Sequence, residues 1–165
     1  MSVTSVTIRP MLEEDREWVR QFIRHEWHDE AIITRGKIVF PAEHHGFLAE
    51  LEGEVVGLAT YRFEELDCEL LTLNSLRPGM GIGTALIKAV EEEACSKGMR
   101  RVWLITTNDN LNALRFYQKR GYHIVTVYPN AIAESRKLKP AIPLTGAFGI
   151  PIRDEIELEL LLNPS

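Results

Sequence analysis

Three glycines alternate with other residues in the segment from Gly79 to Thr84, which lies between a strand-like stretch and an amphipathic helix. Glycine permits a tight turn and a close approach of the backbone to a ligand, because it has no Cβ atom. The helix that follows directs its unpaired N–H groups and the positive end of its dipole at the turn. The segment therefore predicts a strand–turn–helix unit that binds an anion, usually phosphate. A turn that needs glycine for its geometry alone is the alternative.

The order of the remaining segments predicts an α/β domain. Apolar residues recur at helical spacing in three places, and helices are expected over residues 13–27, 82–97 and 111–120. Apolar or alternating runs bounded by turn residues indicate strands, which are expected over residues 3–8, 47–51, 55–61, 68–76, 102–105, 122–128 and 155–162. Residues 29–45 are interpreted as a loop with a short helix, and residues 129–153 as a loop without a clear period.

Length and charge exclude several classes of protein. The chain has 165 residues, which is the size of one domain, so we expect a single domain over residues 1–165. A net charge of −5 disfavours nucleic acid as a partner. No segment approaches the roughly 20 apolar residues that span a bilayer. Residues 1–9 lack the features of a signal peptide, so we expect a cytoplasmic protein without a membrane partner.

Cysteine and histidine spacing gives no sign of a metal site. Cys68 and Cys95 form no CxxC pair and are expected to be free thiols. His25 and His28 could face the same way, but no third ligand follows at a spacing typical of metal sites. We therefore expect no metal and interpret these histidines as polar surface residues.

The spacing of residues in and after the glycine turn distinguishes between the cofactors that such turns can bind. A nucleotide P-loop needs Lys and then Ser or Thr directly after its last glycine, whereas Thr84 follows Gly83 and no lysine occurs before Lys88. A dinucleotide fingerprint needs an acidic residue about 20 positions further on, where this chain has Thr106 and Thr107. Both of these nucleotide sites are therefore disfavoured.

The turn instead resembles the acyl-CoA pyrophosphate loop of the GNAT superfamily of N-acetyltransferases. The family pattern is Arg or Gln, two residues, Gly, any residue, and Gly or Ala, which corresponds here to residues 78–83. Pro78 departs from its first position, and the adjacent Arg77 is expected to reach the phosphates instead. A second segment, with Asn110, Ala113, Phe116, Tyr117, Gly121 and Tyr122, resembles the family's sequence after the fifth strand. The resemblance covers residues 3–128.

The resemblance implies a fold and a cosubstrate. The fold would be a mixed, partly antiparallel sheet of about six to seven strands flanked by helices, and the cosubstrate would be acetyl-CoA. Leu71 to Leu73 would border the pantetheine on one side, and Ile105 to Asn108 on the other. The backbone from Met80 to Thr84 would bind the pyrophosphate; this segment is Met80, Gly81, Ile82, Gly83 and Thr84. Asn110 would bond the pantetheine arm, with a helix N-cap as the alternative.

Two residues would take part in the chemistry that the resemblance implies. Tyr117 matches the family's general acid, which protonates the departing CoA thiolate; the alternative is a core residue beside Leu114 and Phe116. Glu69 would be the base that deprotonates the amine, directly or through water, with a solvated strand residue as the alternative. Glu64 and Glu65 are weaker candidates for the base.

The acceptor stays open at this level. Residues 129–153 lie where family members often build acceptor sites or dimer contacts, so a homodimer is one arrangement they could support. Their basic residues could bind an acceptor carboxylate, whereas the acidic chain as a whole suits a cationic acceptor. The resulting hypothesis is an enzyme that moves an acetyl group from acetyl-CoA to a primary amine, on a small molecule or a peptide, in a ternary complex. A noncatalytic acyl-CoA-binding regulatory module on the same fold is the alternative.

Overall fold

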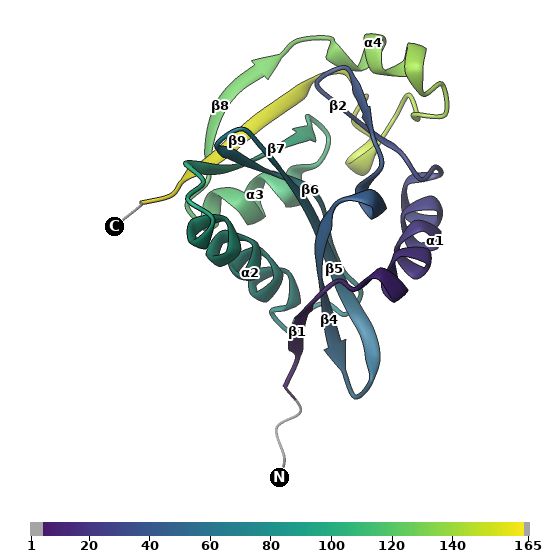
Figure 1. The fold of residues 1–165 in the computed structure, drawn as a ribbon. Helices are drawn as coiled ribbons and strands as arrows, with labels where there is room; N and C mark the ends of the chain where they lie inside the picture. The colour runs from purple at the N-terminus through teal and green to yellow at the C-terminus, as the bar shows by residue number, and fades with distance from the viewer. Residues whose placement is uncertain (1–4, 164–165) are drawn as a thin grey trace.

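The computed structural model describes residues 5–163, in which seven strands form one mixed sheet. The sheet order is β1-β4-β5-β6-β7-β9-β8 (Figure 1). The strands are β1 (Thr7–Pro10), β4 (His45–Leu51), β5 (Glu54–Glu64), β6 (Asp67–Ser75), β7 (Arg101–Thr107), β8 (His123–Tyr128) and β9 (Glu155–Leu161). Only β6 and β7 run parallel; every other neighbouring pair in this sheet is antiparallel. The predicted α/β fold with a mixed sheet is therefore confirmed.

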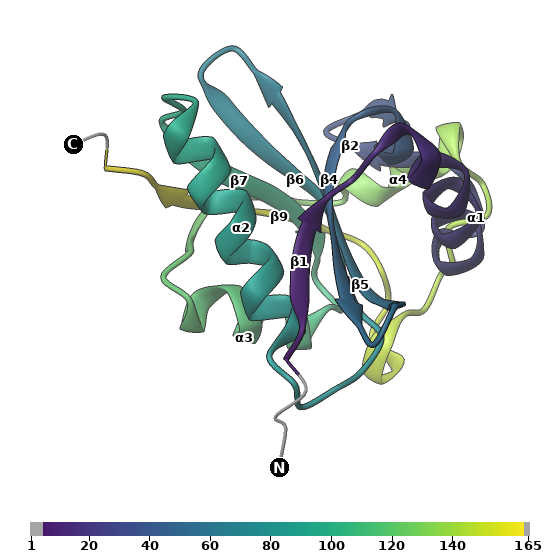
Figure 2. The same ribbon diagram turned by 60° about the horizontal axis from the view of Figure 1, so that its bottom comes forward.

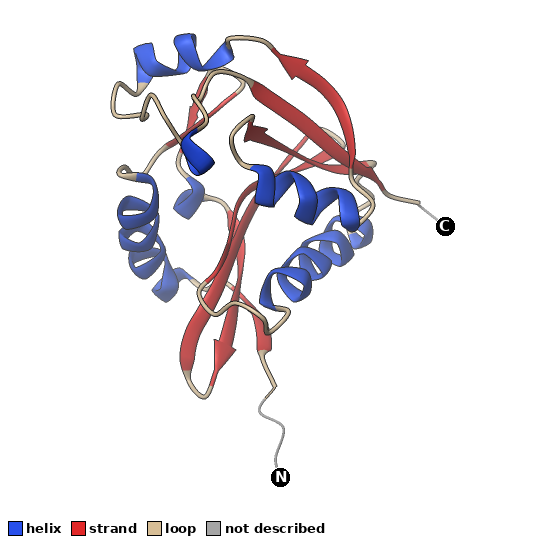
Figure 3. Cartoon of the chain, turned by 180° about the vertical axis from the view of Figure 1, so that it is seen from behind, coloured by secondary structure: helices blue, strands red, loops and turns tan. Residues whose placement is uncertain are grey.

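Helices cover both faces of the sheet. α2 (Ile82–Ser96) and α3 (Leu111–Lys119) lie on one face, and α1 (Arg16–Trp27) and α4 (Ala131–Leu138) lie on the other (Figures 1 and 2). The view from behind shows the same division (Figure 3). A short hairpin of β2 (Ile32–Thr34) and β3 (Lys37–Val39) lies on the side of α1 and α4. None of the helices in residues 5–163 is long and apolar enough to cross a membrane.

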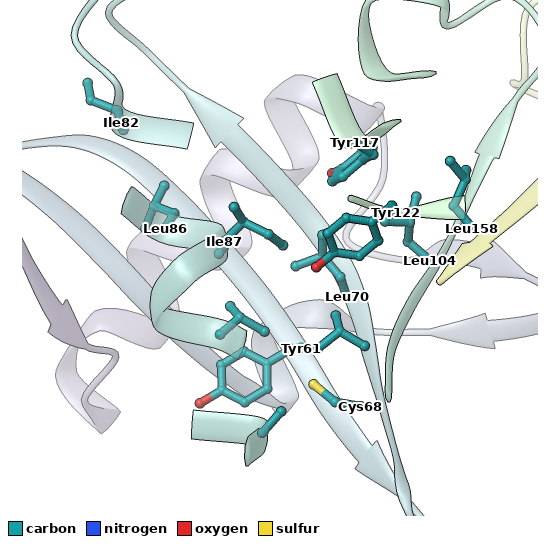
Figure 4. Packing of buried hydrophobic residues seen from close by; sticks show 14 of the residues in the cluster. Tyr61, Cys68, Leu70, Ile82, Leu86, Ile87, Leu104, Tyr117, Tyr122 and Leu158 are labelled. Atoms are coloured by element: carbon teal, nitrogen blue, oxygen red, sulfur yellow. The ribbon is translucent and has the colours of Figure 1, made fainter. Parts of the chain in front are cut away.

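The main core lies between the sheet and α2. Buried side chains from the strands, α2 and α3 form it, among them Leu70, Leu86, Leu104 and Tyr122 (Figure 4). A smaller core under α1 contains Val19, Ile23, Ala42, Leu48 and Leu58. Cys68 is buried in the main core, Cys95 is exposed, and both thiols are free. The two cores fix the sheet between its helices.

The first strand and the first helix differ from the sequence-based expectation. β1 begins at Thr7 and runs through Pro10, which pairs with Phe47, whereas a strand over residues 3–8 was expected; residues 3 and 4 lie outside the described residues. Trp18 and Trp27 fit the apolar stripe of α1 by spacing, but they are 38% and 41% exposed. Only Val19 and Ile23 of α1 are buried in the small core, and both tryptophan rings stay near the surface.

Two segments expected as loops contain regular structure. Residues 29–45 form the β2–β3 hairpin and a 3-10 turn at Pro41–Glu43. The hairpin turns at Arg35 and Gly36, both with positive φ, which is the geometry of a two-residue hairpin turn. Residues 129–153 contain α4 and a 3-10 turn at Ala147–Gly149. The expectation of an irregular segment was wrong here, because α4 is only eight residues long and too short to show a helical period.

Candidate functional site

The two parallel strands separate after their first residues. β6 and β7 pair only through Asp67–Glu69 and Arg101–Trp103, although both strands continue for several residues. Past this point the facing edges make no ladder with each other, so their backbone N–H and C=O groups are available to an extended ligand. β6 also carries a bulge at Leu71. Leu73, two residues further, packs partly against the main core.

The glycine turn leads from the open end of β6 into α2. Gly79 and Gly81 have φ of 80° and 71°, a left-handed conformation that glycine adopts without strain. Gly81 is the N-cap, no side chain caps the helix, and the first intrahelical bond runs from the Ala85 N–H to the Gly81 carbonyl over 3.0 Å. The N–H groups of residues 82–84 therefore lack partners within the helix. An anion fits this uncapped N-terminus.

The side chains of the turn divide between core and surface. Ile82 is buried, and Met80 is 43% exposed. Gly83 allows α2 and α3 to pack closely, since a Cβ at this position would lie 3.3 Å from the Phe116 ring. Arg77 is exposed and pairs with Glu54 over 2.9 Å.

A second arginine lies at the first turn of α2. Arg120 Nε donates to the Thr84 hydroxyl over 3.0 Å, and its guanidinium lies 3.6 Å from the centre of the Phe116 ring. The sequence did not single out Arg120, because its position beside Thr84 depends on how α3 packs against α2. It places a positive charge next to the turn, which Pro78 cannot do.

Asn110 and Asn108 occupy the end of β7 with different partners. The Asn110 side chain accepts from the Ala113 N–H over 3.3 Å, as a helix N-cap, and donates to Thr106 Oγ1 over 3.2 Å. The N-cap alternative for Asn110 therefore describes the structure. The Asn108 amide accepts from the N–H groups of Arg153 and Asp154 and donates to the Pro151 carbonyl. Asn108 thus fastens the segment before β9 to the end of β7.

Tyr117 lies in the main core on α3. Its ring packs edge-on against Phe116 and Tyr122, at centroid distances of 5.1 and 5.5 Å. Figure 4 shows Tyr117 beside Tyr122 in the core. Burial raises the pKa of the Tyr117 phenol above its ordinary value. The hydroxyl therefore keeps its proton at neutral pH, as a general acid must.

Glu69 lies at the closed end of the opening, where β6 and β7 are still paired. It is 1% exposed, and both of its oxygens accept hydrogen bonds: Oε2 from the Thr34 hydroxyl over 2.6 Å and Oε1 from Arg62 Nε over 2.9 Å. A buried carboxylate held in this way stabilises the packing of β5, β6 and β2. These contacts favour a structural role for Glu69 over the expected role as a base.

A cavity of about 380 Å³ lies beside the open end of β6 and β7. Leu71, Ile105, Thr106 and Asn110 contribute to its wall from the strand ends and the start of α3. The rest of the wall comes from the end of α1, β2, α4 and the segments on either side of the 3-10 turn at 147–149. The cavity thus joins the strand opening to the face that carries α1 and α4.

The family model of the GNAT acetyltransferase family matches residues 10–122 of this chain, a range that includes the strand opening, the glycine turn and α3. The chain belongs to the GNAT acetyltransferase family. Two Bacillus subtilis proteins of uncharacterized function are relatives of this GNAT chain. YdhI is 43% identical, with 90% of this chain and 94% of YdhI covered, and YxbD is 39% identical, with 93% and 97% covered.

Solved GNAT structures share the fold of this chain. An IAA acetyltransferase from Bacillus cereus superposes with a TM-score of 0.75 at 22% identity, over 96% of this chain and all of that one. A GNAT acetyltransferase from Elizabethkingia anophelis with acetyl-CoA bound superposes with a TM-score of 0.69 at 19% identity, over 96% of this chain and 99% of that one. At these identities the likeness concerns the fold.

The GNAT chain has a buried carboxylate in the cavity wall that the sequence did not single out. Glu155, the first residue of β9, is 4% exposed. The Ser135 hydroxyl donates to its Oε1 over a long 3.4 Å, and no described residue donates to its buried Oε2. Burial raises the pKa of Glu155, and the hydrogen bonds from the Ser135 hydroxyl and the Arg35 backbone, with the charge of Arg35, oppose this shift more weakly. The alternation of Glu and apolar residues over 155–160 was the available signal, because it places the three carboxylates on one face of a strand.

Lys139 also lines the cavity of the GNAT chain, at the end of α4. Its Nζ donates to the carbonyls of Trp27 and Ala31 over 2.9 and 3.0 Å. Burial lowers its pKa, and Asp29 acts in the opposite direction. The other basic residues of this segment have different partners: Lys137 pairs with Glu134, and Arg136 donates to the Ile152 carbonyl.

A buried aspartate holds the last loop over the cavity. Asp109 Oδ1 accepts from the Thr107 hydroxyl over 2.5 Å, and Oδ2 accepts from the Ala147 N–H over 2.9 Å. Gly146 makes this approach possible, since a Cβ at that position would lie 2.1 Å from Asp109 Oδ2. Both oxygens of Asp109 are thus engaged in fastening the loop.

Proposed function

We propose that this GNAT chain is an acetyl-CoA-dependent N-acetyltransferase that transfers the acetyl group directly to a primary amine in a ternary complex. The observation that carries the proposal is the separation of β6 from β7, which ends at an uncapped helix N-terminus on one side and a cavity on the other. This arrangement suits one ligand with an extended arm and an anionic group. The solved E. anophelis structure of the same fold has acetyl-CoA bound.

The pyrophosphate is proposed to bind at the glycine turn. The support is the set of unpartnered N–H groups at residues 82–84, together with the open space around Gly79 and Gly81. Arg120 and Arg77 are the candidate charged partners, and Arg120 is the better placed because it already contacts Thr84. The pantetheine arm would lie along Leu71 to Leu73 and Ile105 to Asn108.

The acetyl end would then lie near Asn110 and the mouth of the cavity. The amine attacks the thioester carbon, the C–N bond forms, and the C–S bond breaks. Tyr117 donates its proton to the departing thiolate, which suits a phenol that burial keeps protonated. Asn110 is proposed to orient the arm while it caps α3.

The amine must lose a proton before it attacks, since a free amine near pKa 10 is almost fully charged at neutral pH. Glu69 would act only through water, because its oxygens already accept from Thr34 and Arg62. Glu155 is a better candidate for contact with the amine, because it lies in the cavity wall and has an oxygen without a donor.

A thiol-release assay with acetyl-CoA across small amines, amino acids and peptides tests the proposal, with CoA binding measured separately by calorimetry. We expect CoA to bind and thiol to appear only when an amine is present. CoA binding without release on any amine would favour the noncatalytic acyl-CoA-binding module. The absence of both CoA binding and thiol release would refute the enzyme and the noncatalytic module alike.

A further inference from the structure

We infer that the acceptor of this chain carries a carboxylate as well as its amine, as an apolar amino acid does, and that Lys139 binds the carboxylate while Glu155 binds the amine. The inference rests on the proposed function, since it assigns the acceptor of that reaction. Two observations support it. Glu155 and Lys139 both line the cavity, and neither has an ion-pair partner among the described residues that would occupy it.

The Oε2 atom of Glu155 requires a donor that the described residues do not supply. A buried carboxylate is costly unless it is hydrogen-bonded. Glu155 accepts a long bond from Ser135 and interacts with the Arg35 backbone N–H, but no described residue donates to its buried Oε2. Asp109, the other buried acid in the cavity wall, is fully engaged with Thr107 and Ala147. An ammonium group would supply Glu155 with charge-assisted hydrogen bonds.

Lys139 offers the complementary charge. Its Nζ is fixed by two backbone carbonyls, which are neutral, and it has a third N–H to donate. It forms no ion pair with Asp or Glu within residues 5–163, and the neighbouring lysine, Lys137, pairs with Glu134 instead. A carboxylate would therefore meet a partly desolvated cation at Lys139 that interacts with Asp29 only at longer range.

The two groups are placed so that one small molecule can contact both. Ser135, which contacts Glu155, precedes Lys139 by four residues, and the Lys139 N–H donates to the Ser135 carbonyl over 2.8 Å. Glu155 and Lys139 both line this cavity, and they form no ion pair with each other. Ile32, Ile132 and Ile142 line the same cavity and suit an apolar side chain.

The test compares leucine with two analogues that each lack its carboxylate charge, isoamylamine and leucinamide. For the parent protein with acetyl-CoA, we expect kcat/KM for leucine to exceed that for either analogue. Removing one partner of a buried charge pair weakens binding strongly, so Lys139→Met should lower kcat/KM for leucine about 100-fold. The same variant should change kcat/KM for isoamylamine less than about twofold. Lys139→Arg should restore part of the leucine activity.

Matched control variants distinguish an effect at the cavity from a general effect of substitutions in α4. Lys137→Met removes a lysine two positions away that pairs with Glu134 on the surface, and it should leave all three acceptors unaffected. Glu155→Gln should reduce kcat/KM for leucine and isoamylamine alike, because both carry the amine. Its control is Glu134→Gln, which should reduce neither.

Binding measurements separate this inference from the proposed function. With CoA present, leucine should raise the Tm of the parent protein and not that of Lys139→Met, while CoA affinity by calorimetry stays equal in both. Leucine binding without turnover would support the proposed acceptor site and contradict the proposed acetyltransferase activity. Equal use of leucine and isoamylamine, or equal losses on both in Lys139→Met, would overturn the inference while leaving acetyl transfer intact.

Discussion

At the scale of single residues, Tyr117 carries the proposed acid chemistry although it lies in the main core. The same burial that packs its ring against Phe116 and Tyr122 keeps its hydroxyl protonated. The sequence pattern placed Tyr117 both at the family's acid position and in an apolar stripe. Its place in the main core bears out the second description, and its role as the acid stays a prediction.

Replacing Tyr117 with Phe removes the acidic proton and keeps the ring. We expect CoA affinity to be unchanged and turnover to fall roughly 10- to 100-fold, within the range of general acid catalysis. Calorimetry and steady-state kinetics measure the two quantities. Tyr122→Phe is the control, since the Tyr122 hydroxyl donates to Glu91 instead. Unchanged turnover in Tyr117→Phe would remove this residue from the mechanism.

Glu69 tests the difference between a structural and a catalytic carboxylate. Its contacts with Arg62 and Thr34 predict that Glu69→Gln loses stability, by about 1–3 kcal/mol in the free energy of unfolding. Denaturant unfolding measures this loss. The acidic limb of the pH profile of kcat/KM should stay in place, and a shifted or missing limb with unchanged stability would restore Glu69 as the base.

Replacing Glu155 is expected to have the opposite effect on stability. Because burial raises its pKa in the folded protein, the protonated form is favoured by folding and the ionised form is disfavoured. The stability that this shift contributes is present at acidic pH and is lost as the pH rises through the raised pKa. Glu155→Gln should therefore raise Tm more at pH 8 than at pH 4, as calorimetric scans can measure. An equal effect at both pH values would show that the native carboxylate is not destabilised.

At the scale of elements, the strand–turn–helix unit from β6 to α2 is where sequence and structure agree best. Its signals are local: alternating glycines, an apolar helix face and the left-handed Gly98 that follows the helix. The β2–β3 hairpin and α4 were missed because each is short and depends on the contacts it makes in the folded chain. Arg120 acquires its position from Thr84, which is distant in sequence, and no local pattern reveals it.

The glycine turn provides a matched pair of substitutions. Gly81 and Gly98 begin and follow α2 with φ of 71° and 76°, and neither has an atom within 4 Å of a would-be Cβ. Alanine at either position should cost about 1–2 kcal/mol of backbone strain. Only Gly81→Ala should weaken CoA binding, as measured by calorimetry. Equal CoA affinity in both variants would argue against a phosphate at this turn.

At the scale of the whole molecule, the cavity that is proposed to bind the acceptor is assembled from segments across the described chain. The end of α1, β2, α4 and the last loop meet over the opening between β6 and β7. The sequence predicts most of the proposed CoA site, because the glycine turn and the two strand edges belong to one βαβ unit. The shape of the cavity could not be predicted, since the family model covers residues 10–122 and the segment that closes the cavity lies beyond it.

The central claim is direct transfer of acetyl from CoA to an amine, and amine-dependent thiol release tests it most directly. Mixing the protein with acetyl-CoA alone should give no burst of free thiol. Adding leucine or another accepted amine should then release one thiol per molecule of acetylated amine, with the product counted by mass spectrometry. A stoichiometric burst of thiol before any amine is added, or bound CoA with no release across the amine panel, would contradict the account.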